Sequence, residues 1–189
     1  MDSGNGAIAP VALAGASFSG WALSPHLQLT HSTSGLSRRR RTPLADMVYR
    51  YRFLGDRTLL GNVAALYVRA VPGLFAGSSF EGIVMPPAPV ESIAYATGMA
   101  LLTEVAKQLR LVPLQQGVVC SNQHTGPGSN GGVSLSCTAA RSLFRDRSVL
   151  VITDFVRSAK SLAGLCTLLR EAGTRELAVL AATTLQVQR

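Results

Sequence analysis

One carboxylate and several hydroxyl groups follow an apolar run in residues 149–161, which read V-L-V-I-T-D-F-V-R-S-A-K-S. The apolar run predicts a buried strand with Asp154 at its carboxyl end, where ligands bind in open α/β sheets. The small residues after it predict a tight loop that opens a helix, and a helix N-terminus attracts phosphate. Ser158 and Ser161 add hydroxyl donors, Lys160 adds positive charge, and Asp154 suits sugar hydroxyls or the water shell of Mg²⁺. These residue types predict a site for a sugar phosphate.

The same stretch has a simpler interpretation, which the residues alone leave open. Asp154 would then only cap the helix that follows an ordinary strand-to-helix turn. Other chemistries find no support in the sequence. The three histidines are isolated from one another, which argues against a metal site, and no G-x-S-x-G motif indicates a serine hydrolase.

The neighbouring segments predict the sheet that would position this site. Residues 148–153 and 176–184 are apolar runs typical of buried strands, and the helical pattern of residues 161–172 lies between them and ends at Gly173. A strand–helix–strand unit of this kind gives parallel strands with a right-handed crossover. We therefore expect an α/β fold with an open, mainly parallel, twisted sheet flanked by helices. Further helices are predicted at residues 43–54, 56–71 and 93–110, strands at 82–85 and 118–120, and a long polar loop at 121–138.

The first of these helices alternates aromatic and basic residues. We expect its aromatic side chains to be buried and its arginines to be solvated, in the run Tyr49, Arg50, Tyr51, Arg52 and Phe53. Asp56 and Arg57 follow Gly55, and we expect them to cap the next helix and to form internal ion pairs rather than to act in catalysis.

Three parts of the chain together resemble type I phosphoribosyltransferases, and in particular the ComF-like family linked to bacterial competence. Residues 149–161 resemble the family's phosphoribosyl-pyrophosphate (PRPP) motif, in which apolar residues, two acids and a Thr/Gly loop precede a helix. Residues 51–59, Y-R-F-L-G-D-R-T-L, resemble the Gly-Asp-Arg region of ComF-like proteins. Residues 83–87, I-V-M-P-P, resemble the family's strand that runs into prolines, and the resemblance spans residues 43–184 in the same order.

The resemblance implies a function for the site. It implies a phosphoribosyltransferase that binds PRPP with Mg²⁺, with Asp154 as the catalytic residue and as a metal ligand through water. The residues that it assigns to PRPP or phosphate are Thr153, Asp154, Arg157, Ser158, Ala159, Lys160 and Ser161.

The departures from the family pattern all remove charge complementarity to an anionic substrate. Thr153 stands where the family has the first of two acids, Ala159 replaces the loop glycine, and Arg157 excludes an aspartate base at its position. Residues 88–97 contain only Glu91 as a charged residue, and residues 121–138 contain no base. An active phosphoribosyltransferase and a catalytically inactive relative, which binds a ligand or a partner in DNA uptake, both remain open.

The N-terminal residues differ in composition from the rest of the chain. Residues 1–41 hold four arginines, all in residues 38–41, in a Ser/Thr/Gly-rich context, and we expect a flexible basic extension there, with the phosphoribosyltransferase-like domain at 42–189. Residues 8–23 are apolar but too short for a confident membrane span, so we expect no membrane anchor. The basic run, within a net charge of +8, leaves nucleic-acid binding open as a third, weaker hypothesis.

Composition sets the remaining limits. Hydrophobic residues make up 47% of the 189 residues and charged residues 15%, so the chain can bury a core. Cys120, Cys137 and Cys166 show no C-x-x-C spacing, which excludes a zinc ribbon. We expect three free thiols and a cytoplasmic protein, because a sparse and odd number of cysteines fits a reducing compartment.

Overall fold

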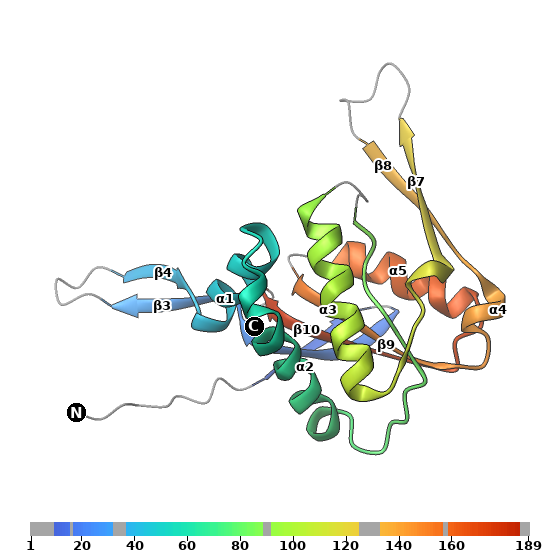
Figure 1. The fold of residues 1–189 in the computed structure, drawn as a ribbon, viewed down its shortest axis with the longest axis horizontal. Coiled ribbons are helices and arrows are strands. Elements are labelled where there is room, and N and C mark those ends of the chain that lie inside the picture. The colour runs from blue at the N-terminus through green and yellow to red at the C-terminus, as the bar shows by residue number, and fades with distance from the viewer. Residues whose placement is uncertain are drawn as a thin grey trace.

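A six-stranded sheet in the order β1-β2-β10-β9-β5-β6 forms the centre of the computed structural model, which describes residues 10–15, 17–31, 37–88, 92–124, 133–156 and 159–185 (Figure 1). Each neighbouring pair from β2 to β6 is parallel, and only β1 runs antiparallel to its neighbour. The strands are β1 (Val11–Gly15), β2 (Phe18–Pro25), β10 (Glu176–Thr184), β9 (Ser148–Val156), β5 (Gly82–Val84) and β6 (Val112–Pro113). The structure confirms the predicted α/β class with an open, mainly parallel sheet.

The central strands are buried on both faces. All residues of β10 except Glu176 are buried, and so are the first six residues of β9. Val149 and Val151 of β9 pack into one core, while Leu150 and Ile152 pack into the other, as the alternation of side chains along a strand requires. Helix α5 (Ala159–Glu171) connects β9 to β10, and Gly173 follows it with a positive φ of 91°, as predicted for a helix end.

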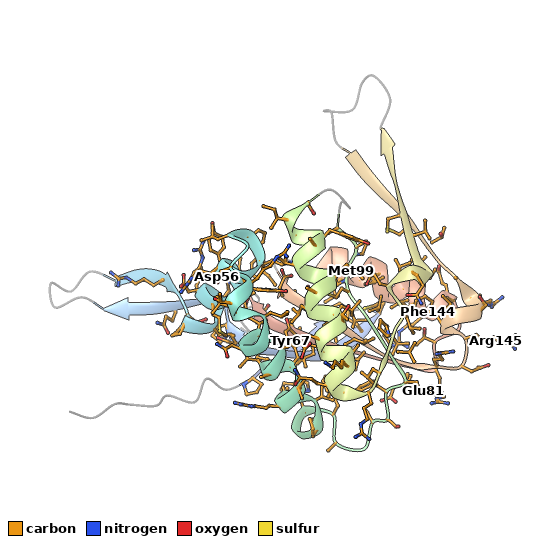
Figure 2. All side chains as sticks on the ribbon, viewed as in Figure 1. Asp56, Tyr67, Glu81, Met99, Phe144 and Arg145 are labelled. Atoms are coloured by element: carbon orange, nitrogen blue, oxygen red, sulfur yellow. A yellow bond between two sulfur atoms is a disulfide. The ribbon has the colours of Figure 1, made fainter. Side chains whose placement is uncertain are left out.

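Helices cover both faces of the sheet. The core that contains Leu150 and Ile152 is closed by α1 (Pro43–Phe53), α2 (Leu60–Leu74) and α3 (Ile93–Leu109). The opposite core is closed by α5 and by the short helix α4 (Arg141–Phe144), whose Phe144 is fully buried (Figure 2). The 3₁₀ turns η1 (Arg57–Leu59) and η2 (Gln115–Gly117) precede α2 and β7.

Local signals placed the helix boundaries well. The Thr42 hydroxyl accepts a hydrogen bond from the Ala45 amide at 3.2 Å, and Pro43 is the first residue of α1, as predicted. The Ser92 hydroxyl accepts from the Tyr95 amide at 3.0 Å and starts α3. Pro72 was predicted to stop α2, but the helix continues through it to Leu74.

Residues 11–25 correct the prediction of a flexible N-terminal extension. Residues 11–15 form β1 and residues 18–25 form β2, and β2 lies parallel to β10 with Gly20 opposite Val179. The small residues that make this stretch look weakly structured are what the strand needs, because a Cβ atom at Gly20 would lie 2.0 Å from the Val179 carbonyl oxygen. The central sheet therefore includes residues on both sides of the boundary predicted at residue 41.

The basic run also lies in regular structure. It forms β4 (Ser37–Arg41), which pairs antiparallel with β3 (Leu27–His31) in a hairpin that projects from the body (Figure 1). The Arg41 guanidinium lies 3.8 Å from the centre of the Tyr49 ring, which ties the hairpin to α1.

A second hairpin corrects the prediction of a long loop and of three free thiols. β7 (Val118–His124) and β8 (Val133–Ala139) pair antiparallel, and a disulfide joins Cys120 to Cys137, which are directly opposite each other. The hairpin extends away from the body (Figure 1), so its strands lack the apolar pattern by which a buried strand is recognised. Cys166 is free, as predicted, and the structure shows that it is buried.

The disulfide bears on the predicted compartment. The expectation of a cytoplasmic protein depended on reduced cysteines, and disulfides persist in oxidising compartments. The compartment therefore remains a prediction without that support. In the described part of the chain, no helix is long and apolar enough to cross a membrane.

Candidate functional site

The carboxyl end of β9 opens on a cavity of about 200 Å³. Its walls come from the end of β9, from the proline-containing segment after β5, from the beginning of α5 and from α1. The lining residues are Arg52, Met85, Pro86, Pro87, Ala88, Thr153, Asp154, Phe155, Val156 and Leu162. The cavity therefore lies where the sequence predicted a ligand, at a strand end and beside a helix N-terminus.

Asp154 lies in this cavity wall as a residue of the strand rather than of the loop. β9 continues to Val156, three residues beyond the predicted end, and Phe155 still pairs with Thr183 of β10. Helix α5 begins five residues after Asp154, and the Asp154 Oδ1 atom accepts a hydrogen bond from the Phe155 amide at 3.1 Å. The alternative in which Asp154 only caps the helix is therefore not what the structure shows.

Arg52 of α1 is the ion-pair partner of Asp154. The Arg52 Nε atom donates to Asp154 Oδ2 at 2.5 Å, and only 8% and 15% of the two side chains are exposed. Ion pairs in such a setting are poorly screened by solvent and salt. The carboxylate at the strand end is thus already neutralised by a cation of the protein itself.

Several contacts hold Arg52 in place. Its Nη1 atom donates to the Thr97 hydroxyl at 3.1 Å, and that hydroxyl donates in turn to the Ile93 carbonyl at 2.9 Å. The Tyr51 hydroxyl donates to the Thr97 carbonyl at 2.6 Å, so consecutive residues of α1 both bind Thr97 of α3. These contacts fix the guanidinium between α1, α3 and β9.

We expected Arg52 to be solvated together with Arg50, and its place in the site was not predicted from the sequence. Arg50 is indeed exposed, with 53% of its side chain accessible, but Arg52 is buried. Two signals pointed to it: Arg52 lies four residues after the buried Val48, on the same side of the helix, and the lone acid of the motif needed a counter-charge. Among the aromatic residues, Tyr51 is buried as expected and Phe53 is 52% exposed.

Two hydroxyl groups donate hydrogen bonds to backbone carbonyls near the end of β9. The Tyr67 hydroxyl of α2 donates to the Thr153 carbonyl at 2.8 Å, and Tyr67 is fully buried (Figure 2). Burial, followed by the charge of Asp154, raises the pKa of Tyr67 well above its ordinary value, so this phenol remains a neutral donor. The Thr183 hydroxyl donates to the Asp154 carbonyl at 3.4 Å.

His26 supports the same strand end from the edge of the sheet. Its Nδ1 atom is 3.1 Å from the Thr183 hydroxyl, and its ring centre is 4.3 Å from that of Phe155, a residue of the cavity wall. Desolvation, and then the charge of Arg41, lowers the pKa of His26. The imidazole of His26 therefore favours its neutral form, and it packs against Phe155 of the cavity wall.

The predicted site residues divide into two groups. Thr153 and Asp154 line the cavity. Arg157 and Ser158 lie outside the described residues, and Ala159, Lys160 and Ser161 are described only by their backbone, as the first turn of α5. Leu162, the next residue, lines the cavity, so the first turn of α5 lies beside it, and phosphate binding by these residues stays a prediction.

The described residues do not fit a protein-held Mg²⁺. Asp154 is the only acid among the described residues that line the cavity, and its carboxylate already accepts from Arg52 and from the Phe155 amide. No three His, Cys, Asp or Glu side chains of the described residues form a group that could hold a metal. A guanidinium beside the carboxylate also repels a cation.

The Gly-Asp-Arg region lies outside this cavity. Asp56 pairs with Arg50 at 2.7 Å and accepts a hydrogen bond from the Thr58 hydroxyl at 2.5 Å. The Thr58 hydroxyl, followed by Arg50, lowers the pKa of Asp56. The expected internal ion pair is present, but Asp56 forms it with Arg50. Arg57 instead lines a separate cavity of about 260 Å³ between α1, α2 and α3.

Comparison with known proteins identifies the fold. The sequence matches no family model and no curated protein. The structure is similar to adenine phosphoribosyltransferase from Saccharomyces cerevisiae, complexed with an imino-altritol bisphosphate and adenine, with 13% identity over 84% of either chain and a TM-score of 0.52. It is also similar to glutamine PRPP amidotransferase from B. subtilis complexed with ADP and GMP, with 14% identity and a TM-score of 0.51. That match covers 86% of this chain but 37% of the amidotransferase, so the chain spans about a third of its length. The chain therefore has the fold of the type I phosphoribosyltransferases.

Proposed function

We propose that the chain binds a ribose phosphate, namely PRPP or a related nucleotide, in the cavity at the carboxyl end of β9. One observation carries this proposal: Asp154, the segment after β5 and the start of α5 converge on one cavity in a phosphoribosyltransferase fold. The two solved neighbours are named for a reaction with PRPP or a phosphoribosyl group, and their complexes contain adenine or nucleotides.

Each wall of the cavity suits one part of such a ligand. Asp154 accepts hydrogen bonds from the ribose hydroxyls, since a carboxylate has lone pairs beyond those used by Arg52 and the Phe155 amide. The first-turn amides of α5, with the hydroxyls of Ser158 and Ser161 and the charge of Lys160, bind the 5′-phosphate. The volume of about 200 Å³ is below the roughly 300–1,000 Å³ of common ligand pockets, and this small size suits the ribose phosphate part of the ligand.

Phosphoribosyl transfer with release of pyrophosphate is the activity that this fold suggests, and a catalytically inactive relative is the second candidate. The ion pair of Arg52 with Asp154 favours the second candidate, because the one acid of the motif is already neutralised. Thr153 supplies no second carboxylate. Each missing charge-stabilising group typically costs about 3 kcal/mol in the transition state, so several losses together would sharply slow turnover. We expect binding to be the retained property.

Calorimetric titration of the full chain with PRPP, ribose 5-phosphate and GMP tests the binding proposal. The wild type should bind at least one of them and should not bind ribose, which lacks the phosphate. Asp154→Asn keeps the shape of the side chain and should weaken binding about tenfold, the loss expected for a charge-assisted hydrogen bond. Asp56→Asn removes a surface carboxylate outside the cavity and is the matched control, which should leave affinity unchanged. Failure of the wild type to bind any of the three phosphates would contradict the proposal.

A second measurement separates the two candidates. An active phosphoribosyltransferase releases pyrophosphate from PRPP in the presence of a nucleobase or amine acceptor, whereas an inactive relative binds without release. We expect binding without measurable release.

A further inference from the structure

The charges that line the cavity indicate a narrower class of ligand than the fold of the chain does. Arg52 and Asp154 are the only charged side chains among the described residues that line it, and they pair with each other at 2.5 Å. The described wall therefore carries no net charge. The proposed function assigns the charge of Lys160 to one 5′-phosphate group, and a pyrophosphate group, with several further negative charges, needs additional cations or a metal that this described wall does not offer.

Arg52 occupies a position that excludes a cation from Asp154. Its Nε atom contacts Oδ2 directly, and its Nη1 atom is bound by the Thr97 hydroxyl, so the guanidinium cannot swing away without breaking both contacts. The two carboxylate oxygens still have lone pairs that a neutral hydroxyl can use. The geometry thus admits sugar hydroxyls and repels metal ions.

We propose that Arg52 replaces a divalent metal as the counter-charge of Asp154, so that the site binds a ribose monophosphate without Mg²⁺ and in preference to PRPP. The ligand class is a sugar or nucleoside bearing one 5′-phosphate group. This inference rests on the proposed function, because it concerns the same cavity. In this role Arg52 is a positioning residue that holds the carboxylate ready for the ribose.

Arg52 lines two neighbouring cavities, and this position supports the assignment. Arg52 lines the main cavity and also a smaller cavity that extends between Met85, Gln115 and the first turns of α3. The Gln115 side-chain oxygen accepts from the Met85 amide at 2.9 Å, which fixes the wall between them. The guanidinium is therefore a fixed part of the cavity rather than a surface side chain that a ligand displaces.

The test is a comparison of affinities in EDTA and in Mg²⁺, measured by calorimetry on the full chain. For the wild type, the dissociation constant of ribose 5-phosphate should change by less than about twofold between the two conditions. The wild type should also bind ribose 5-phosphate more tightly than PRPP in EDTA. Tight binding that appears only with Mg²⁺ would overturn the inference and leave the proposed function intact. No binding of any phosphate in either condition would instead contradict the proposed function itself.

Arg52→Gln removes the charge and keeps a hydrogen-bond donor. In EDTA its affinity for ribose 5-phosphate should fall about tenfold or more, because the unpaired carboxylate repels the phosphate, and added Mg²⁺ should restore part of the loss. Arg50→Gln, two residues away on the exposed side of α1, is the matched control and should behave as the wild type. An Arg52→Gln variant that is folded and binds as the wild type does in EDTA would overturn the inference. If that variant does not fold, the metal dependence of the wild type decides alone.

Discussion

Gly98 of α3 leaves room for the guanidinium of Arg52: a Cβ atom at position 98 would lie 2.5 Å from Arg52 Nη1. The glycine is buried in α3, next to Thr97, which binds Tyr51 and Arg52 of α1. The ion pair of Arg52 with Asp154 therefore depends on a residue without a side chain in another helix.

Gly98→Ala should displace Arg52 and destabilise the protein. Alanine gains about 1 kcal/mol of helix propensity over glycine, but loss of hydrogen bonds to a charged group costs about 1.5–3 kcal/mol. We expect a net loss of about 1 kcal/mol in the free energy of unfolding, measured by urea denaturation, together with weaker ribose 5-phosphate binding. Gly164→Ala is the control, because no atom lies within 4 Å of its added Cβ in helix α5, and it should stabilise the protein. Equal stabilisation by both substitutions would show that Arg52 moves freely.

The Arg52–Asp154 pair should show strong coupling in a double-mutant cycle. Arg52→Met leaves a largely buried carboxylate without its partner, and we expect a loss of about 3 kcal/mol, at the lower end of the range for broken buried pairs because Asp154 keeps 15% exposure. The double variant Arg52→Met/Asp154→Leu should lose much less than the sum of the two single variants. Additive losses would mean that the pair is not formed in solution.

Gly20→Ala should detach β2 from the sheet. Its Cβ would lie 2.0 Å from the Val179 carbonyl oxygen, a backbone atom of the central strand that cannot move aside cheaply. We expect a loss of about 2–3 kcal/mol, as for overpacked interiors, measured by denaturation. Ser19→Ala, at an exposed position of the same strand, should be nearly neutral. A Gly20→Ala variant as stable as the wild type would contradict the placement of residues 18–25 in the sheet.

Thiol titration should reveal one free cysteine in the oxidised chain. The chain has three cysteines, of which Cys120 and Cys137 form the disulfide of the β7–β8 hairpin. Burial raises the pKa of Cys166 to about 12, so the native protein should not react with a thiol reagent at about pH 8. Unfolding without reductant should expose one thiol, and unfolding after reduction should expose three. Three reactive thiols without reduction would mean that the hairpin is not cross-linked.

His26 should make the folded protein sensitive to mild acid. Its pKa in the folded state is below the ordinary value of 6.5, so folding favours the neutral ring. The resulting stability is complete above pH 6.5 and is lost as the pH falls through the folded-state pKa, because the unfolded chain takes up the proton first. The free energy of unfolding should therefore fall as the pH is lowered below the ordinary His pKa of 6.5, and His26→Gln should show a shallower fall. The same slope in both proteins would exclude His26 as the cause.

The sequence by itself determined the elements whose signals are local. The apolar runs of β9 and β10 and the helical pattern of α5 act over a few residues, so the strand–helix–strand unit and the place of Asp154 near the carboxyl end of its first strand were predictable. The structure confirms that unit and the α/β class.

Only the tertiary structure decided which distant residues meet. Arg52 and Asp154 are 102 residues apart, and Cys120 faces Cys137 because of a hairpin whose strands carry no core pattern. Residues 11–25 look weakly structured because their small side chains carry little hydrophobic signal, yet a strand that packs against the Val179 backbone requires such residues. These contacts depend on how chain segments pack against one another, which no short window of sequence encodes.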